Sequence, residues 1–205
     1  MHVPARTDVA ECIEALLIDL GLRPGDRLPS ERAMAEELGV SRPTLREAMR
    51  TLVDNQMLEA RRGAGTFLVG PDLRDLSVVR QALEPLAARL AAQHATEGER
   101  AEIARLTERL AGALRDPRRF AAVDFDLHRA LAHASHNAVL LGYLEGLERM
   151  LRLSRAQTAG DPATRRATLD EMQRLNDAIG AGDGEQAEAA MAAHMSRIAD
   201  QLNAG

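Results

Sequence analysis

Hydrophobic residues recur every three or four positions through residues 8–52, a spacing that predicts amphipathic helices. The first predicted helix spans residues 8–20, DVAECIEALLIDL. Its packed side would hold Val9, Cys12, Ile13, Leu16, Leu17 and Leu20. Two short helices joined by a tight turn are predicted within residues 29–52. Ser30 and Ser41 are suitable N-caps for them, and Gly39 suits a left-handed end of the first.

The second helix of this pair separates an apolar side from a basic side. At about 100° per residue, one arc carries Leu45, Ala48, Met49 and Leu52. The neighbouring arc carries Arg42, Arg46 and Arg50. We therefore expect one side to pack against the domain and the next to present three guanidinium groups.

A β-hairpin with a basic tip is predicted after the helix pair. Two short runs, residues 57–60 and 66–69, flank the sequence RRGAG. Helix, turn, arginine-bearing helix and basic hairpin together favour a winged helix-turn-helix that docks on DNA. The pattern breaks at Gly70-Pro71-Asp72, so the first domain is expected to cover residues 1–70.

Every long segment after this break has helical periodicity. The expected helices are residues 76–93, 99–114, 118–135, 138–158, 162–181 and 185–202. Pro85 is expected to kink the first of them or to mark its start. Short links between six helices predict an all-α antiparallel bundle over residues 76–205. The fold class is therefore mainly α, with a winged helix-turn-helix followed by a helical bundle.

Composition agrees with two helical domains. Of the 205 residues 45% are apolar, but there are only three Phe, one Tyr and no Trp. No run of about 18 apolar residues predicts a membrane span, and the first residues lack the apolar core of a signal peptide. The one cysteine, Cys12, fits a cytoplasmic protein. We expect it to be buried as a small hydrophobe.

The formal net charge of −5 argues at first against a nucleic-acid partner. Even the first 70 residues carry 9 Arg against 11 Asp or Glu, a net of −2. DNA binding needs positive charge only at the docking surface, and the arginines gather on the predicted recognition helix and hairpin tip. The average charge therefore does not exclude a nucleic-acid partner.

One constellation in the second domain suits a metal ion. Asp124 and His128 are four residues apart, so they project from one face of a helix. His194 lies on the last helix, where a bundle can bring it alongside. Aspartate with imidazoles suits Zn, Ni or Mn. The alternative for Asp124 and His128 is a surface ion pair.

The first domain resembles a known family. LRPGDRLPSERAMAEELGVSRPTLREAMRTL, followed by RRGAGTFLV, is similar to the DNA-binding domain of the GntR family of bacterial transcription regulators over nearly all of residues 8–70. The alternative is a solvated helix pair of any helical protein. The resemblance implies DNA contacts from Arg32, Ser41, Arg42, Thr44, Arg46, Arg62 and Gly63. Arg42 and Arg46 can read guanine edges, and the others can hold phosphates or form the wing tip.

The second domain resembles the FCD effector domain of the FadR-type branch of that family, over about residues 76–202. The segments VRQALEPLAARLAA, DFDLHRALAHASHN and DAIGAGDGEQAEAAMAAHM carry the likeness. Many FCD domains hold a metal with one Asp and three His. Asp124, His128 and His194 match three of these positions, but Met172 stands at the other. Either water, the effector or a shifted side chain completes the site, or the metal is lost and the cavity binds effector directly.

Two further positions match the family's effector cavity. Arg80 matches an arginine that faces the cavity, where it can pair with a carboxylate, although an exposed helix arginine is the alternative. Asn137 either caps the next helix or contacts the effector. With Met172, these residues form the expected effector site.

The resemblance implies a homodimer on a double-stranded palindromic operator. We expect a repressor that a small organic acid releases, with activation and corepression left open. Such control requires the effector to prefer one arrangement of the protein. A different class is a metal-dependent helical enzyme using Asp124, His128 and His194, and a third is a protein-interaction bundle.

Overall fold

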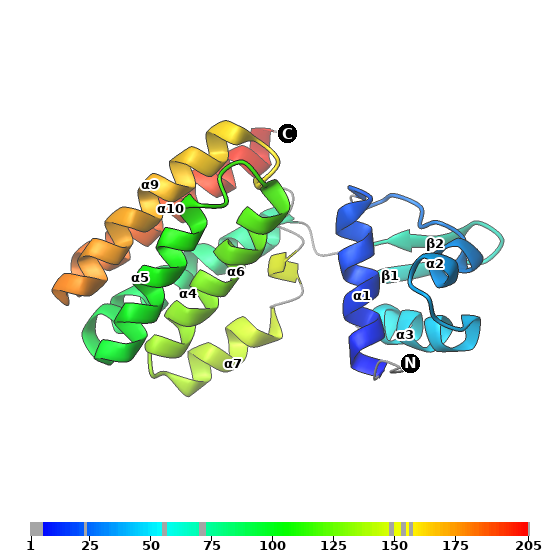
Figure 1. Ribbon diagram of the computed structural model, residues 1–205, viewed down its shortest axis with the longest axis horizontal. Coiled ribbons are helices and arrows are strands. Elements are labelled where there is room, and N and C mark those ends of the chain that lie inside the picture. The colour runs from blue at the N-terminus through cyan, green and yellow to red at the C-terminus, as the bar shows by residue number, and fades with distance from the viewer. Residues whose placement is uncertain are drawn as a thin grey trace. The chain divides into compact units, whose positions relative to one another are not determined.

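The computed structural model describes residues 6–22, 24–54, 57–69, 73–147, 150–152, 155 and 158–204. The chain divides into two compact units, residues 1–71 and 72–205 (Figure 1). The predicted boundary at Gly70-Pro71-Asp72 lies outside the described residues. As predicted, the fold is mainly helical, with helices and a β-hairpin in the first unit and a helical bundle in the second.

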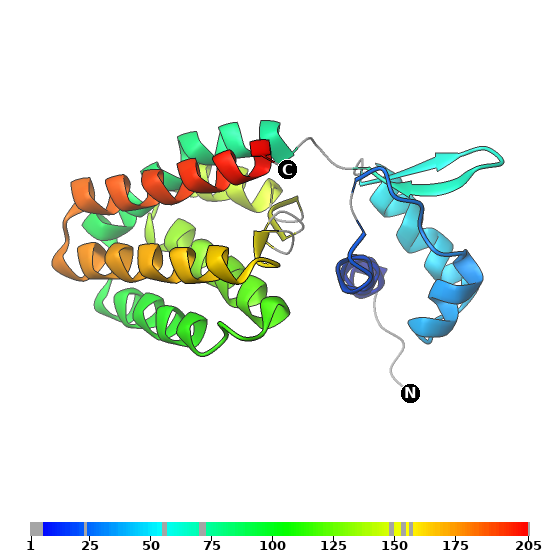
Figure 2. The ribbon, with the colours of Figure 1, turned by 90° about the horizontal axis from the view of Figure 1, so that it is seen from above.

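The first unit contains three helices and one hairpin. The helices are α1 (Arg6–Asp19), α2 (Glu31–Glu37) and α3 (Arg42–Asp54), and the strands are β1 (Leu58–Arg61) and β2 (Gly65–Leu68). In Figure 2, α1 is seen almost end-on while α3 runs across the view, so the two helices cross steeply. The two helices pack against each other, and Ile13, Leu17, Leu45 and Leu52 are among their buried side chains.

Local capping explains why α2 and α3 form a helix pair. The Ser30 hydroxyl accepts a hydrogen bond from the Ala33 amide at 3.2 Å, and Ser41 accepts one from the Thr44 amide at 3.2 Å. Between the helices Gly39 has φ +64°, a conformation that costs a side-chain-bearing residue energy. The predicted caps and helix end are therefore confirmed.

The hairpin is held on both edges of β2. Leu58 pairs with Leu68 and Arg61 with Gly65 on the β1 side. On the other side, the Gly25 amide donates to the Leu68 carbonyl at 2.7 Å and the Leu28 amide donates to the Thr66 carbonyl at 2.9 Å. Because backbone groups on both sides of β2 are paired, the tip projects from a fixed base.

Two expectations for α1 are wrong. Cys12 is exposed, and Leu20, which follows the helix, is 50% exposed. The buried side of α1 includes Ala10 and Glu14 beside Val9, Ile13 and Leu17. On an ideal helix this arc lies about 60° away from Cys12. Val9, Ile13 and Leu17 are buried as predicted, and the packed side also takes in charged Glu14, which the apolar pattern did not include.

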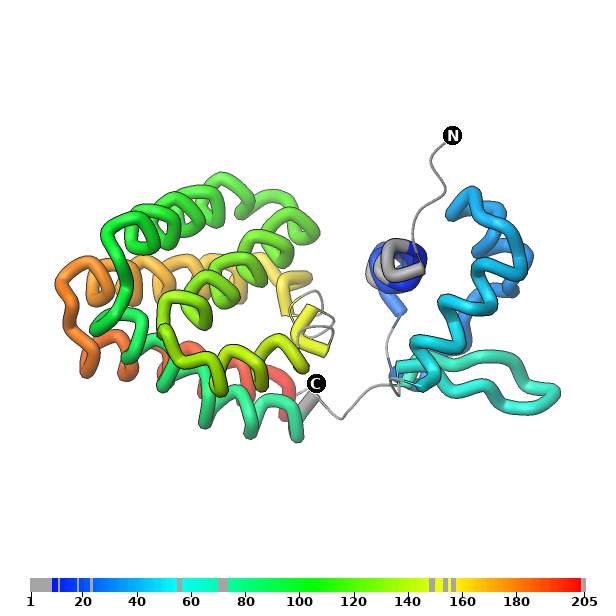
Figure 3. The backbone as a smooth tube through the Cα atoms, turned by 90° about the horizontal axis from the view of Figure 1, so that it is seen from below, coloured from blue at the N-terminus to red at the C-terminus, as the bar shows by residue number. Residues whose placement is uncertain are grey.

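The second unit is a bundle of long helices. They are α4 (Leu73–His94), α5 (Glu97–Ala111), α6 (Pro117–Ala134), α7 (Ala138–Gly146), α9 (Pro162–Ala181) and α10 (Gly184–Ala204). Helix α10 packs on α4 and α9, α5 packs on α6 and α9, and α4 also contacts α6. Figures 2 and 3 show this set from opposite sides. None of the helices in the described part of the chain is long and apolar enough to cross a membrane.

Helix boundaries follow from local sequence, with one correction. Asp116 and Asp161 cap α6 and α9, and each precedes a proline at the first helical position. Helix α4 continues through Pro85. The helix predicted over residues 138–158 is wrong in length, since α7 ends at Gly146, a residue that weakens helices. Residues 148–149, 153–154 and 156–157 of that prediction lie outside the described chain.

Small residues bring α4 and α10 together. Ala88, Ala91 and Ala92 of α4 and Ala187 of α10 are completely buried. Side chains without bulk allow two helix axes to approach closely. The larger fully buried residues of this core are Ile103, Leu110, Leu127, Leu131 and Met172. The polar residues described below lie next to this apolar core.

A reciprocal cap at the start of α5 gives a stability prediction. The Thr96 amide donates to Glu99 Oε2 at 2.8 Å, and the Glu99 amide donates to Thr96 Oγ1 at 3.3 Å. Thr96→Ala should lower the free energy of unfolding by about 1 kcal/mol, because one helix-end donor loses its acceptor. Urea denaturation followed by circular dichroism measures this. Thr96→Ser is the control, and equal stability of the alanine and serine variants would contradict the cap's role.

The same cap predicts a dependence on pH. Hydrogen bonds from Thr96, together with His136, lower the pKa of Glu99 to about 2 from its ordinary value of 4.5. Because the folded pKa is depressed, the stabilisation is present above pH 4.5 and is lost as the pH falls towards 2. The stability difference between wild type and Glu99→Gln should therefore shrink over this range. A difference that stays constant from pH 5 to pH 2.5 would contradict it.

Candidate functional site

Helix α3 presents a basic side to solvent. Leu45, Ala48, Met49 and Leu52 are buried, whereas Arg42, Arg46 and Arg50 are exposed. The predicted division of this helix into a packed side and a basic side is therefore confirmed. A long exposed helix side with guanidinium groups has the dimensions and charge that suit a DNA major groove.

Glu31 of α2 holds two of these arginines in place. Its Oε2 lies 2.7 Å from Arg46 Nε and 3.9 Å from an Arg42 nitrogen. The side chains of Arg42 and Arg46 remain 58% and 54% exposed. Exposed ion pairs contribute at most about 1 kcal/mol. A phosphate or a base edge can therefore replace Glu31 at small cost.

Two hydroxyls lie at the amino end of α3. Ser41 Oγ and Thr44 Oγ1 are 2.7 Å apart, and Ser41 also caps the helix. A helix amino end carries partial positive charge and suits an anion. Arg32 of α2 is exposed and pairs with Glu36 at 3.0 Å. Of these predicted DNA contacts, Ser41 and Arg32 are exposed and Thr44 is half-buried.

The hairpin tip carries the remaining predicted contacts. Arg62 and Gly63 lie in the exposed turn between β1 and β2, and Gly63 has φ +76°. The neighbouring Arg61 is held by Glu59 at 2.8 Å, and its guanidinium lies 4.3 Å from the centre of the Phe67 ring. Arg61 is therefore fixed to the hairpin, while Arg62 is presented at the tip.

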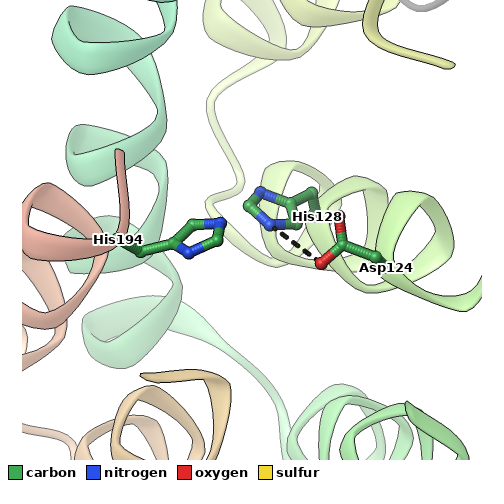
Figure 4. A group of neighbouring side chains, drawn as sticks. All are labelled: Asp124, His128 and His194. Carbon is green, nitrogen blue, oxygen red and sulfur yellow. Dashed lines mark ion pairs between the residues drawn. The ribbon is translucent and has the colours of Figure 1, made fainter. Parts of the chain in front are cut away.

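In the bundle, Asp124 and His128 of α6 meet His194 of α10. Their potential ligand atoms all lie within 4.8 Å of one another. Figure 4 shows His194 reaching from α10 towards the two α6 side chains. All three residues are buried, so the alternative of a surface ion pair between Asp124 and His128 is wrong.

Unpaired buried atoms make this cluster suitable for a metal ion. Asp124 Oδ1 and His128 Nε2 are 3.7 Å apart and have no hydrogen-bond partner in the described structure. Buried polar atoms are normally paired, so two orphans facing each other indicate a missing partner. One carboxylate and two imidazoles are ligands that Zn and related ions accept. The buried cluster Asp124–His128–His194 could therefore hold a divalent metal.

Carboxylates orient both rings of the cluster. His128 Nδ1 contacts Glu84, and His194 Nδ1 lies 2.7 Å from Glu171 Oε2. In each ring, Nε2 is therefore the nitrogen that is left to bind a metal. Metal-binding histidines commonly have their second nitrogen held by a carboxylate in this way.

Burial lowers the pKa of His128 to about 4, and the nearby Arg155 guanidinium adds to the effect. The ring is therefore neutral near pH 7, which is the form that binds metals. Burial alone would raise the pKa of Glu84, but Arg80, His128 and Arg155 together hold it well below its ordinary value. Glu84 is therefore an ionised carboxylate inside the bundle.

Arg155, between α7 and α9, is the central residue that sequence reasoning missed. One of its terminal nitrogens donates to Asp124 Oδ2 at 2.8 Å, and the other donates to Glu84 Oε2 at 3.3 Å. Its side chain is 3% exposed, and its Nε has no hydrogen-bond partner in the described structure. No local pattern pointed to Arg155, because these partners lie 31 and 71 residues away.

Arg80 is also buried. It is 2% exposed, so the alternative of an exposed helix arginine is wrong, and its Nε donates to Glu84 Oε1 at 2.6 Å. Glu84 was also missed, although it follows Arg80 by four residues, the spacing of a helical ion pair. The cluster is thus joined to two buried arginines and a second carboxylate.

The other two expected effector residues are Met172 and Asn137. Met172 is 1% exposed in the main core, and its neighbour Glu171 is the residue that contacts His194 and Arg197. Asn137 is exposed and caps α7, accepting a hydrogen bond from the Leu140 amide at 3.0 Å. Neither Met172 nor Asn137 is among the described residues that line two small cavities next to the Asp124–His128–His194 cluster.

Two cavities adjoin the cluster and both include Arg155 in their walls. The smaller, of about 10 Å³, is polar and lined by residues that include Arg80, Asp124, His194 and three threonines, Thr158, Thr164 and Thr168. The larger, of about 30 Å³, is mainly apolar and reaches His128 and Glu84. Small internal cavities therefore adjoin the buried arginines and the cluster.

Comparison with known proteins agrees with both units. Residues 5–68 match the model described as bacterial regulatory proteins, gntR family, and residues 75–197 match the FCD domain. The chain is 35% identical over 217 residues to the putative L-lactate dehydrogenase operon regulatory protein of Escherichia coli (strain K12), covering 93% of this chain and 83% of that protein.

A second relative and a solved structure extend the likeness. The HTH-type transcriptional regulator LutR of Bacillus subtilis (strain 168) is 31% identical over 205 residues, with 89% of this chain and 94% of LutR covered. The structure of E. coli McbR/YncC has a TM-score of 0.81 at 27% identity, with 99% of each chain covered.

These family matches are to transcription regulators and not to enzymes. They follow one another along the chain in the same order as the two units of the structure. Because they also span most of its length, the chain belongs to the gntR family of bacterial regulatory proteins, in the FadR-type branch that carries an FCD domain.

Proposed function

We propose that this regulator is a homodimeric repressor that binds a palindromic operator and is released by a small organic acid in the bundle. The exposed basic side of α3 is the observation that carries the proposal. A two-fold dimer would place two such helices on two half-sites of the operator. Since bacterial DNA lies in the cytoplasm, the proposal also places the protein there.

On DNA, Arg42 and Arg46 would read guanine edges in the major groove. Arg32, Ser41 and Thr44 would hold the phosphates beside them, and Arg62 and Gly63 would bring the wing tip to the duplex. The exposure of Arg42 and Arg46, and their weak pairing with Glu31, support this assignment. Exchange of Glu31 for DNA would occur without disturbing the buried side of α3.

In the bundle, the buried charges favour an anionic effector when a metal is bound. Arg80 and Arg155 balance the carboxylates of Glu84 and Asp124. Asp124, His128 and His194 would hold a Zn, Ni or Mn ion, which supplies two further positive charges and so attracts a carboxylate. Arg80 lines the polar cavity beside these residues, which supports a role in binding the acid. The name of the L-lactate dehydrogenase operon regulator supports the same class of effector.

Control of DNA binding requires that the acid prefers one arrangement of the protein. Its proposed site joins α4, α6, α10 and the segment that carries Arg155, so binding there can change how these parts pack. Reciprocity requires that operator DNA weakens acid binding by the same factor. If acids strengthen DNA binding instead, the protein is a corepressed regulator and the proposed direction is wrong.

The recognition helix is tested by two substitutions. Arg42→Ala and Arg46→Ala should each weaken binding to DNA flanking the protein's own gene by about 1–3 kcal/mol and relax base preference, because a groove contact is lost. Gel shift or fluorescence anisotropy measures this at fixed salt. Arg105→Ala is the matched control, since Arg105 is also 54% exposed and paired with a neighbouring glutamate, but lies on α5. Unchanged affinity in both α3 variants would contradict the assignment.

The metal site is tested by calorimetry with Zn, Ni and Mn on chelator-treated protein. His194→Gln should abolish or greatly weaken binding, because one of three buried ligands is lost. His133→Gln is the control, since that histidine is 53% exposed. Met172→His should raise affinity if this position faces the ion as the family pattern implies. Binding by His194→Gln at wild-type strength would contradict the proposed site.

A further inference from the structure

Arg155 and the proposed metal ion would use the same buried carboxylate. A terminal nitrogen of Arg155 donates to Asp124 Oδ2 at 2.8 Å, while Asp124 Oδ1 has no hydrogen-bond partner among the described residues. This second oxygen lies 3.7 Å from His128 Nε2, which also lacks a partner there. The guanidinium group and a metal ion would therefore each hold one oxygen of a single side chain.

Arg155 is also next to the second ligand on α6, through Glu84. Its other terminal nitrogen donates to Glu84 Oε2 at 3.3 Å, and Glu84 in turn contacts His128 Nδ1. The side chain of Arg155 is 3% exposed, so its charge lies inside the bundle with these groups. One buried cation thus adjoins two of the three residues that could hold a metal.

The charges of this buried network already balance. Two guanidinium groups face two carboxylates, in the pairs Arg80–Glu84, Arg155–Glu84 and Arg155–Asp124. Burial alone would lower the pKa of Arg155, but the two carboxylates hold it above its ordinary value, so the guanidinium is charged. His128 is neutral near pH 7, because burial lowers its pKa to about 4. A divalent ion would therefore add two positive charges to a neutral interior.

Two effects of Arg155 on metal binding oppose each other. As a hydrogen-bond donor to Asp124 it can orient a ligand, which strengthens metal sites. As a cation it repels the metal ion, and repulsion between like charges is strong where water does not screen it. The cluster Asp124–His128–His194 offers one negative charge, and Arg155 already pairs with it. Because this pair is buried, repulsion is the larger effect.

We infer that Arg155 is an internal cation that competes with a divalent metal for Asp124 and keeps the metal affinity of the bundle low. This inference rests on the proposed function, since it concerns the metal site named there. A site with lowered affinity is filled or not according to the metal concentration around the protein, whereas a very tight site stays filled. The metal of this chain is therefore exchangeable and not a permanent structural ion.

Calorimetry with Zn on the chelator-treated full chain tests the competition. Arg155→Gln removes the charge and keeps a donor for Asp124, so it should bind Zn at least about tenfold more tightly than wild type. Arg155→Lys keeps the charge and should stay within about threefold of wild type. Arg152→Gln, the same change at a nearby exposed position, is the control. Equal or weaker Zn binding by Arg155→Gln overturns the inference, because that result is expected if Arg155 only orients Asp124.

Thermal unfolding separates the competition from a loss of packing. In chelator, Arg155→Gln should melt at a lower temperature than wild type, because Asp124 loses its buried partner. Saturating Zn should raise the melting temperature of the variant more than that of wild type, since the tighter ligand stabilises more. Arg155→Met is a second neutral variant should Arg155→Gln not fold. Equal destabilisation of the neutral variant with and without Zn overturns the inference.

A measurement on wild type needs no neutral variant. Arg155 Nε is buried, so its proton is protected from water and can be followed by NMR. The signal is assigned by its absence from Arg155→Lys. Zn should shift it, because the ion and the guanidinium share Asp124. An unchanged signal in Zn-saturated wild type overturns the inference.

The same titrations separate this inference from the proposed function. If wild type binds Zn and Arg155→Gln binds it no more tightly, the inference is wrong while the metal site stands. If neither protein binds Zn, Ni or Mn, the metal part of the proposed function fails, and the inference fails with it. Tighter binding by Arg155→Gln that is lost again when His194→Gln is added supports both.

Discussion

The bundle is organised around buried charges that must balance. Arg155 joins the carboxylates of Asp124 and Glu84, and Arg80 pairs with Glu84 from the same helix. Replacing such a network by apolar residues often leaves stability equal or higher, so stability alone does not account for it. What the network leaves unpaired is informative: Asp124 Oδ1, His128 Nε2 and Arg155 Nε lack partners in the described structure. These atoms mark where the proposed metal ion and acid would complete the interior.

The first unit also pairs arginine with a carboxylate, but it does so at the solvent-exposed surface. Arg46 and Glu31 form an exposed pair, whereas Arg155 and Asp124 form a buried one. Solvent screens the first pair, so DNA phosphates can compete for the guanidinium at little cost. Breaking the second pair leaves an uncompensated buried charge and is expensive. The same kind of ion pair therefore suits a replaceable surface contact in the first unit and a selective internal site in the second.

Local features of the sequence were enough to predict the helix pair, its caps, the hairpin and the i,i+4 placement of Asp124 and His128. Features that depend on distant partners were not. In α1, charged Glu14 is buried and apolar Cys12 is exposed, and only tertiary packing decides this. Nothing in the local sequence distinguishes Arg155 from nearby Arg152. Only tertiary packing buries Arg155 and leaves Arg152 exposed. The family pattern indicates a metal ligand at position 172. The side chain that contacts His194 is instead that of Glu171, one residue earlier.

The central claim is that an acid held by the buried charges of the bundle weakens DNA binding by the first unit. Fluorescence anisotropy with DNA flanking the gene tests this most directly, with and without a panel of carboxylates, on wild type and on folded Arg155→Gln. The account predicts that at least one acid weakens wild-type binding about tenfold, within the usual range of allosteric coupling. It also predicts that the variant binds DNA equally well but does not respond. An equal response in both proteins, or none in wild type, would contradict the account.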